Sequence, residues 1–355
     1  MPDQSTHGAG PRAPATMSDV AALAGVGIKT VSRVINAEPH VSDETRERVL
    51  DAARTLRYRR DLIASTLRRT SRRSRTIAFL MSSVDNPFSS AIHRAVMDAA
   101  GEREAMVFAA ATQEDPVRER ELVEEFVARS VDGVIIAATA AAATALADLS
   151  RPVPVVLIDR LVPGLDVDAV VTDNRDAAFE ATTHLLRHGH RRVALLTEGR
   201  DIWTTGERAQ GYQDALVRAG VPLDPALIVQ DLRGEEAAAR ATHALVTGPR
   251  PPTAIFATQN VLAGGVLRAL RAQGLNRRLA VVGFDDLELA DLIDPPLTTV
   301  VQDPTAIGRA GADRLFARID GGGGPSVLTV VGAHLVVRGS GELSPAAAAG
   351  REDVP

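Results

Sequence analysis

Short, nearly continuous apolar runs separated by amphipathic segments dominate the chain from Thr76 onward. Runs of this kind are typical of strands buried on both faces of a parallel sheet, and the amphipathic segments between them suit crossover helices. The pattern therefore predicts an α/β body. We expect strands at 76–81, 106–111, 131–138, 153–159, 192–197, 253–258 and 279–285, and helices at 88–101, 116–129, 174–188 and 206–219.

The body contains three pairs of similar segments. RTIAFLMSS is similar to RRVALLTEG, VDGVIIAAT to PPTAIFATQ, and VPVVLID to LAVVGFD. The simplest interpretation is two similar α/β halves. Asp159 and Asp285 directly follow the last pair of runs, and ligands of such sheets bind beyond the carboxyl ends of the strands. We therefore expect the two halves to form a cleft with one acid on each side.

The segment before the body has a helical period instead. Val20, Leu23 and Ala24 recur at helical spacing, and Thr16 with Asp19 forms a capping-box pattern. Gly25 is placed to end this helix in the left-handed conformation.

A second helix is expected from Ile28 to Asn36, with Val31, Val34 and Ile35 facing inward. Two short helices joined by a glycine-containing turn form a helix-turn-helix. A phosphate-binding loop is excluded, because Ile28 stands before Lys29 where that motif requires glycine. A third helix should begin at Ser42, with an inward stripe of Val49, Leu50, Ala53 and Leu56.

Charge is divided unevenly along the chain. Residues 16–75 hold 13 Lys or Arg and 7 Asp or Glu, a net charge of +6. Residues 1–15 are neutral and the whole chain carries −5, which leaves −11 for residues 76–355. A basic head on an acidic body is typical of a DNA-binding module joined to a ligand sensor.

Composition excludes several classes of protein. The chain has no Cys, so it contains neither a disulfide nor a thiolate site. No apolar run reaches 18 residues and no signal-peptide core stands at the N-terminus, so we expect a cytoplasmic protein without membrane partners.

Collinear motifs along the chain resemble the LacI/GalR family of transcription regulators. They are DVAALAGV, KTVSRVIN, VSDETRERVLDAARTLRY and IASTL in the head, and VDNPF, VDGVII, RHGHRRVALL, ERAQGY, VVGFDD, PPLTTV and VVRGSG in the body. The resemblance implies an all-α helix-turn-helix head and an α/β two-lobed body similar to periplasmic binding proteins, with two doubly wound parallel sheets. It implies a head at 16–60, a hinge helix and linker at 61–75, and an effector-binding and dimerisation domain at 76–343. The N-lobe would take about 76–172 and 303–328 and the C-lobe about 173–300 and 329–341, with disordered tails at 1–15 and 344–355.

The resemblance also assigns DNA contacts. Bases would be read by Ile28, Lys29 and Arg33, because cations at a recognition helix can donate to guanine and Ile28 can contact a thymine methyl. The remaining contacts would be Thr30, Ser32 and Asn36 on phosphates, Leu67 as a wedge in the minor groove, and Ala64 packing beside its symmetry mate. Gly27, Arg60 and Asp61 depart from the usual Ser, Pro and Asn.

In the body, the resemblance places an effector between Arg208 and Asp285, with Asp159 as a third polar anchor and Phe88 as an apolar wall. This set suits a sugar or sugar derivative. Trp203, Thr204 and Thr258 are weaker candidates, and Thr258-Gln259 replaces the usual Asn-Asp.

Three histidines, His184, His188 and His190, imitate metal-ligand spacing, but no acid is near in sequence, so we expect them to face solvent. No nucleophile motif accompanies them. We therefore predict no metal, no cofactor and no catalytic residues.

The leading hypothesis is a ligand-responsive DNA-binding repressor that forms a dimer on a palindromic operator and is not an enzyme. A dimer is favoured because the C-terminus lacks the leucine heptads that tetrameric members use. A sugar-binding protein without a DNA function is the alternative, and a sugar- or nucleotide-acting enzyme comes third.

Overall fold

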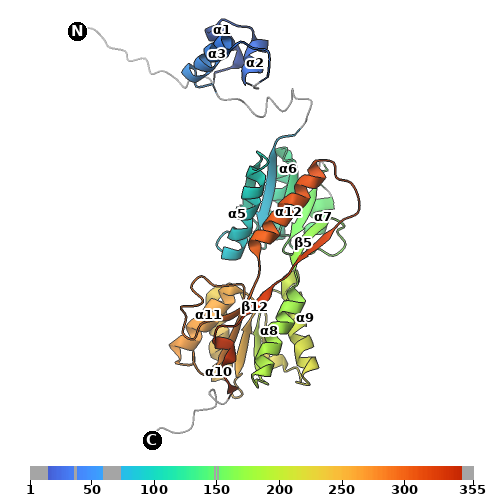
Figure 1. Ribbon diagram of the computed structural model, residues 1–355. Coiled ribbons are helices and arrows are strands. Elements are labelled where there is room, and N and C mark those ends of the chain that lie inside the picture. The colour runs from blue at the N-terminus through green and yellow to red at the C-terminus, as the bar shows by residue number, and fades with distance from the viewer. Residues whose placement is uncertain (1–14, 36–37, 59–72, 148, 150–151, 346–355) are drawn as a thin grey trace, which may run out of the picture. The chain divides into compact units, whose positions relative to one another are not determined.

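The structure of the chain is a computed structural model that describes residues 15–35, 38–58, 73–147, 149 and 152–345 (Figure 1). It divides into two compact units, a head that ends at Ser74 and a body that begins at Arg75. The predicted tails lie almost wholly outside the described residues, and the predicted hinge helix at 61–67 lies outside them altogether.

The head is a three-helix unit of α1 (Met17–Ala24), α2 (Ile28–Ile35) and α3 (Asp43–Thr55). Its helix ends follow from local sequence. Thr16 and Asp19 form the predicted capping box, Gly25 ends α1 at a φ of 65°, and the Ser42 hydroxyl accepts from the first turn of α3. A small apolar core of Val20, Ala21, Ala24, Val31, Val34, Val49, Ala52 and Ala53 holds the three helices together.

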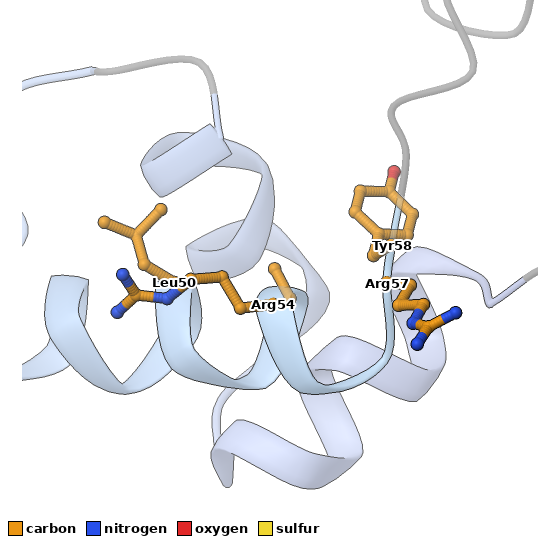
Figure 2. A pocket seen from close by; sticks show the side chains of 5 residues that line it. Leu50, Arg54, Arg57 and Tyr58 are labelled. Atoms are coloured by element: carbon orange, nitrogen blue, oxygen red, sulfur yellow. The ribbon is translucent and has the colours of Figure 1, made fainter.

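Two apolar residues expected inside the head are exposed instead. Leu23 keeps 53% of its surface exposed and Leu50 keeps 40%. The helices are short and the core is filled by Val and Ala, so one leucine on each of α1 and α3 is left outside. Leu50 lines a surface pocket of about 440 Å³ with Ala53, Arg54, Arg57 and Tyr58, at the C-terminal end of α3 (Figure 2).

The body has two lobes, each built on a six-stranded sheet (Figure 1). The N-lobe sheet is parallel throughout and has the order β11-β5-β4-β3-β1-β2. Its strands are β1 (Thr76–Met81), β2 (Met106–Ala111), β3 (Gly133–Ile136), β4 (Val155–Ile158), β5 (Asp168–Thr172) and β11 (Leu328–Val331). Its helices are α5 (Pro87–Gly101), α6 (Pro116–Ala128), α7 (Ala142–Ala147) and α12 (Pro304–Ile319).

The C-lobe sheet has the order β12-β10-β9-β8-β6-β7, in which only the pair of β10 and β12 is antiparallel. Its strands are β6 (Val193–Leu196), β7 (Ile228–Val229), β8 (Ala254–Ala257), β9 (Ala280–Phe284), β10 (Thr298–Val301) and β12 (His334–Val336). Its helices are α8 (Asn174–Arg187), α9 (Trp203–Arg218), α10 (Gly234–Thr247) and α11 (Asn260–Ala272), and two short 3₁₀ turns lie at Pro225–Leu227 and Ser340–Glu342.

The three pairs of similar segments correspond to equivalent places in the two sheets. The order of strands in one lobe maps onto the order in the other, so that β1 matches β6, β3 matches β8 and β4 matches β9. These are the three pairs of similar runs, and the predicted fold class is confirmed.

Each sheet is covered on both faces, which explains why its strands are continuously apolar. In β1, the side chains of Ile77 and Phe79 pack beneath α5 and α12, while those of Ala78 and Leu80 pack beneath α6 and α7. The C-lobe repeats this arrangement, with α8 and α9 on one face and α10 and α11 on the other.

The chain changes lobe three times: between β5 and α8, between β10 and α12, and between β11 and β12. The predicted third boundary, after residue 328, is too early, because β11 pairs with β5 from Leu328 to Val331 and belongs to the N-lobe. Alternate residues of this edge strand are exposed, so it lacks the continuous apolar run that marks the central strands.

The histidine cluster does not face solvent as predicted. His190 is wholly buried, and its ring nitrogens bond the Thr253 hydroxyl at 3.0 Å and the Leu343 carbonyl at 2.7 Å. Burial lowers the pKa of His190, so its ring is neutral at neutral pH. His184 Nε2 forms a hydrogen bond with a carboxyl oxygen of Glu342, and His188 Nδ1 lies 2.9 Å from the His184 carbonyl. The C-terminal segment folds back over the end of α8 and covers these rings, and within the described residues no three potential ligands are placed to hold a metal ion.

Helices α8 and α9 approach so closely that only glycine fits between them. A Cβ on Gly211 of α9 would lie 2.1 Å from the Arg175 carbonyl oxygen of α8. Gly206, on the same helix, has no atom within 4 Å of its Cβ position. Alanine substitutions at these two glycines therefore separate the cost of close packing from the gain in helix propensity.

We predict that Gly211→Ala lowers the melting temperature of the body, because the added methyl forces the two helices apart at a cost of roughly 1–3 kcal/mol. Gly206→Ala should leave stability unchanged or raise it by up to about 1 kcal/mol, since alanine favours the helix. Thermal unfolding followed by circular dichroism checks both. Equal melting temperatures for the two variants would contradict the packing argument.

Candidate DNA-reading helix and interlobe polar site

Helix α2 exposes the side chains that the sequence assigns to DNA bases. Val31 and Val34 are buried in the head core, whereas Ile28, Lys29 and Arg33 are exposed. Ile28 keeps 49% of its surface exposed, so its apolar side chain is not part of the head core. The outer face of α2 therefore carries one apolar group and two cations.

The other predicted DNA contacts are placed less fully. Thr30 and Ser32 on α2 are half-buried. Asn36, Ala64 and Leu67 lie outside the described residues, so their assignments remain predictions.

Arg208 is the central side chain of the body site. It projects from α9 and is only 5% exposed. Its Nε donates to Asn174 Oδ1 at 2.7 Å and its Nη1 donates to the Thr258 carbonyl at 2.6 Å. The guanidinium lies over the Phe284 ring, 3.7 Å from the centroid. Its position is therefore set by four different elements of the C-lobe, α8, α9, β9 and the loop after β8.

Asp285 follows β9 and lies beside this arginine. One of its oxygens is 3.9 Å from Arg208 Nη1, and the Gln302 amide donates to the other. Burial raises the pKa of Asp285, while the charge of Arg208 and the amide hydrogen bond lower it. Asp285 has a φ of 65°, in the left-handed region.

Asp159 is the N-lobe counterpart of Asp285. It follows β4, has a φ of 69°, and donates its amide to the Val170 carbonyl at 2.9 Å, as Asp285 does to the Val300 carbonyl at 2.9 Å. The two lobes therefore present these acids on the same local backbone, as their matching runs predict. Asp159 accepts from Arg160 Nε at 3.3 Å.

Arg160 was missed by sequence reasoning. It is 6% exposed and donates through Nη1 and Nη2 to both oxygens of Glu114, at 2.6 and 2.7 Å. A fork-to-fork pair of this kind fixes both side chains. The signal was present, because an arginine directly follows the predicted acid Asp159, but a charged pair after a strand usually faces solvent.

Glu198 was missed as well. It follows β6 and Thr197, and it interacts electrostatically with Arg160 of the N-lobe and Arg208 of the C-lobe. Burial raises its pKa to about 7; the two arginines lower it, and Glu114 and Asp285 raise it further. The charged groups of both lobes therefore form one cluster around this carboxyl.

The remaining predicted residues have mixed roles. Phe88 is half-buried and packs on the N-lobe core, and Trp203 opens α9 rather than lying on a loop before it. Thr204 is buried in the first turn of the same helix. The Thr258 hydroxyl donates to Thr197 Oγ1 at 2.9 Å, and the Thr258 carbonyl accepts from Arg208.

The lobes also touch directly beside the cluster. Asn86, which caps α5, accepts a hydrogen bond at 3.2 Å from the amide of Asn260, at the start of α11. The site thus combines two guanidinium groups fixed in place, several carboxyl groups and amides from both lobes. These groups can bind and orient a polar molecule.

Within the described residues, no helix is both long enough and apolar enough to cross a membrane.

Comparison with known proteins agrees with this architecture. Residues 16–61 match the family model "Bacterial regulatory proteins, lacI family" and residues 182–341 match "Periplasmic binding protein-like domain". The HTH-type transcriptional repressor CytR of Escherichia coli is 31% identical over 334 residues, which cover 93% of this chain and 97% of CytR.

Two solved structures are similar over nearly the whole chain. The transcriptional regulator CelR in complex with cellobiose has a TM-score of 0.69 and 33% identity, over 92% of this chain and 99% of that one. The lac repressor dimer bound to operator and the anti-inducer ONPF has a TM-score of 0.82 and 27% identity, over 94% of this chain and 100% of that one. The chain is therefore a member of the LacI family, a DNA-binding transcriptional regulator and not an enzyme.

Proposed function

We propose that the protein is a repressor that binds a two-fold symmetric operator as a homodimer and changes its operator affinity when a carbohydrate or carbohydrate derivative binds between the lobes. Operator binding is supported by the outer face of α2, where Ile28, Lys29 and Arg33 are all exposed. Such a helix fits the major groove, where a long cation can donate to guanine N7 and O6.

The body supports the effector half. Arg208 is held by hydrogen bonds to Asn174 and Thr258, so its position is set before any ligand arrives. Vicinal hydroxyls of a sugar can accept from a guanidinium and donate to a carboxylate such as Asp285. CelR, a similar protein, is named as a complex with cellobiose, which makes carbohydrates the first class to test.

A dimer is supported by exposed apolar side chains on the body. Large side chains with more than a third of their surface exposed include Met97, Met106 and Phe108 in the N-lobe and Leu289 and Leu292 in the C-lobe. Apolar surface of this kind on a globular body suits an interface. A DNA-binding dimer would act in the cytoplasm, where a bacterial chromosome lies.

The N-cap position of α2 could hold a better capping residue than glycine. Gly27 stands at the N-cap, and its carbonyl accepts from Thr30 N at 2.8 Å and Val31 N at 3.2 Å. No atom lies within 4 Å of a Cβ built at Gly27, so a larger residue fits there. A serine would add a hydroxyl that can cap the helix and can also reach a phosphate.

We predict that Arg33→Ala weakens operator binding by roughly 1–3 kcal/mol and relaxes base preference at the position that Arg33 reads. Arg48→Ala on α3 is the matched control, since it removes the same charge from another exposed position of the head. Fluorescence anisotropy with operator and random duplexes at fixed salt checks both variants. An equal loss on the two duplexes for Arg33→Ala would show that this arginine contacts only phosphate.

Gly27→Ser should tighten operator binding, because the serine side chain caps α2 at a gain of a few tenths of a kcal/mol and adds a phosphate contact. The melting temperature of the head should rise slightly with it. Titration of operator at fixed salt measures the affinity, and an unchanged or weaker affinity would contradict the prediction.

Arg208→Ala should abolish release of the operator by any sugar that releases the wild type, while the ligand-free variant still binds the operator. Arg218→Ala, at the exposed end of the same helix, should respond as the wild type does. Operator dissociation at increasing sugar concentration measures the response. Release of Arg208→Ala at the wild-type concentration would show that the effector binds elsewhere.

A further inference from the structure

The charged cluster between the lobes holds more acids than bases. Its carboxyl groups are Glu114 and Asp159 from the N-lobe and Glu198 and Asp285 from the C-lobe, and its cations are Arg160 and Arg208. Four carboxyl groups thus stand against two guanidinium groups. The excess of negative charge sets which ligands the site tolerates.

Arg160 is largely engaged by acids of the protein itself. Its Nη1 and Nη2 donate to Glu114, and its Nε donates to Asp159. Three of its five N–H donors are thus used, and a ligand anion that approached this guanidinium would face two carboxylates that belong to the protein.

Arg208 is nearly as fully used. Nε donates to Asn174 and Nη1 donates to Thr258, and Asp285 lies 3.9 Å from Nη1. Only Nη2 lacks a hydrogen-bond partner among the described residues. Arg208 therefore offers a ligand mainly this one nitrogen, on a cation that already faces an acid.

Acceptors, in contrast, remain available in the cluster. The carboxyl of Glu198 has no hydrogen-bond partner within the part of the chain that the structure describes, and its charge is felt by Arg160 and Arg208 alike. Gln302 is 6% exposed; its amide nitrogen donates to Asp285, and its Oε1 has no partner there. A buried amide oxygen of this kind needs a donor to satisfy it.

We propose that Glu198 makes the interlobe site selective against anions, so that the effector is a neutral or cationic molecule that carries hydroxyl or amino donors rather than a sugar phosphate or sugar acid. The inference rests on the proposed function and narrows it. A phosphate or carboxylate brought here would face Glu198 and Asp285 at low dielectric, where like charges repel strongly. A hydroxyl or ammonium group instead donates to Glu198 and Gln302.

The charge of Glu198 makes this selectivity depend on pH. Burial raises the pKa of Glu198 to about 7, against the lowering effect of Arg160 and Arg208 and with the further raising effect of Glu114 and Asp285. The carboxyl is therefore mostly neutral below pH 7 and mostly ionised above it, so discrimination against anions should increase as the pH rises through 7.

The same shift has a consequence for the ligand-free protein. The folded chain holds the Glu198 proton more tightly than the unfolded chain, whose carboxyl has the ordinary pKa of 4.5. Stability from this group is therefore full below the unfolded value and falls as the pH rises from 4.5 to about 7. Glu198→Gln removes this fall.

The first experiment needs no ligand. Melting temperatures of the full-length wild type, Glu198→Gln and Asp201→Asn are compared across the acid-to-neutral range. Asp201 is an exposed acid in the same loop, so its variant controls for loss of a charge. We expect the wild type and Asp201→Asn to lose stability toward pH 7 relative to Glu198→Gln. Parallel profiles for all three would overturn the predicted pH dependence of the selectivity, since Glu198 would then be an ordinary acid that is ionised across this range.

The second experiment uses matched probes: glucose with glucosamine and glucose 6-phosphate, and ribose with ribose 5-phosphate, at pH 6 and pH 8. Trp203, the only tryptophan, opens the helix that carries Arg208, and its fluorescence reports binding. Neutral or amino probes should bind in preference to their phosphates. Glu198→Gln should weaken that preference by about tenfold at pH 8 and less at pH 6.

Two outcomes distinguish failure of the charge selectivity from failure of the carbohydrate effector. Binding of a sugar phosphate by the wild type at pH 8, as tight as binding of its neutral parent, would overturn the charge selectivity alone. If no probe binds the wild type or Glu198→Gln while their melting profiles still differ, the carbohydrate effector of the proposed function is contradicted. The raised pKa of Glu198 is then still supported by the melting profiles.

Discussion

The buried guanidinium of Arg208 is the interaction on which the ligand half of this protein depends. A charge taken out of water costs several kcal/mol unless its hydrogen bonds and its counter-charge are supplied in place. Here the supply comes from Asn174, from the carbonyl of Thr258, from the Phe284 ring and from Asp285, four groups that the C-lobe fold must bring together. Arg208 is therefore fixed without a ligand, and an effector bound as we propose would have to fit the position that it already holds.

The duplicated architecture places an acid opposite this arginine. Because the two sheets share one strand order, Asp159 and Asp285 follow equivalent strands with nearly the same φ, and each donates its amide to the next strand over. The chain passes between the lobes three times, so a molecule bound to both acids would act on all three connections.

Much of this could be predicted from sequence, for identifiable reasons. Central strands such as β1 and β9 are buried on both faces, which leaves a continuous apolar run, while the edge strands β11 and β12 are half-exposed and leave no such signal. Helix caps at Thr16 and Gly25 were predictable because they depend on neighbours in sequence. The burial of His190 and the bidentate pair of Arg160 with Glu114 could not be predicted, because they depend on partners 153 and 46 residues away in the sequence. Glu198 was missed for the same reason, since its neighbours in the chain resemble those of any polar loop.

The central claim, a dimeric repressor that reads a specific operator, is tested most directly by selecting bound sequences from a randomised duplex pool with the purified full-length protein at near-physiological salt. The account predicts enrichment of a two-fold symmetric site with a central base step that is easily kinked, because two heads would each present one α2 to a major groove. Recovery of all sequences alike, with affinity set only by salt, would contradict it, since the basic head would then bind DNA through charge alone.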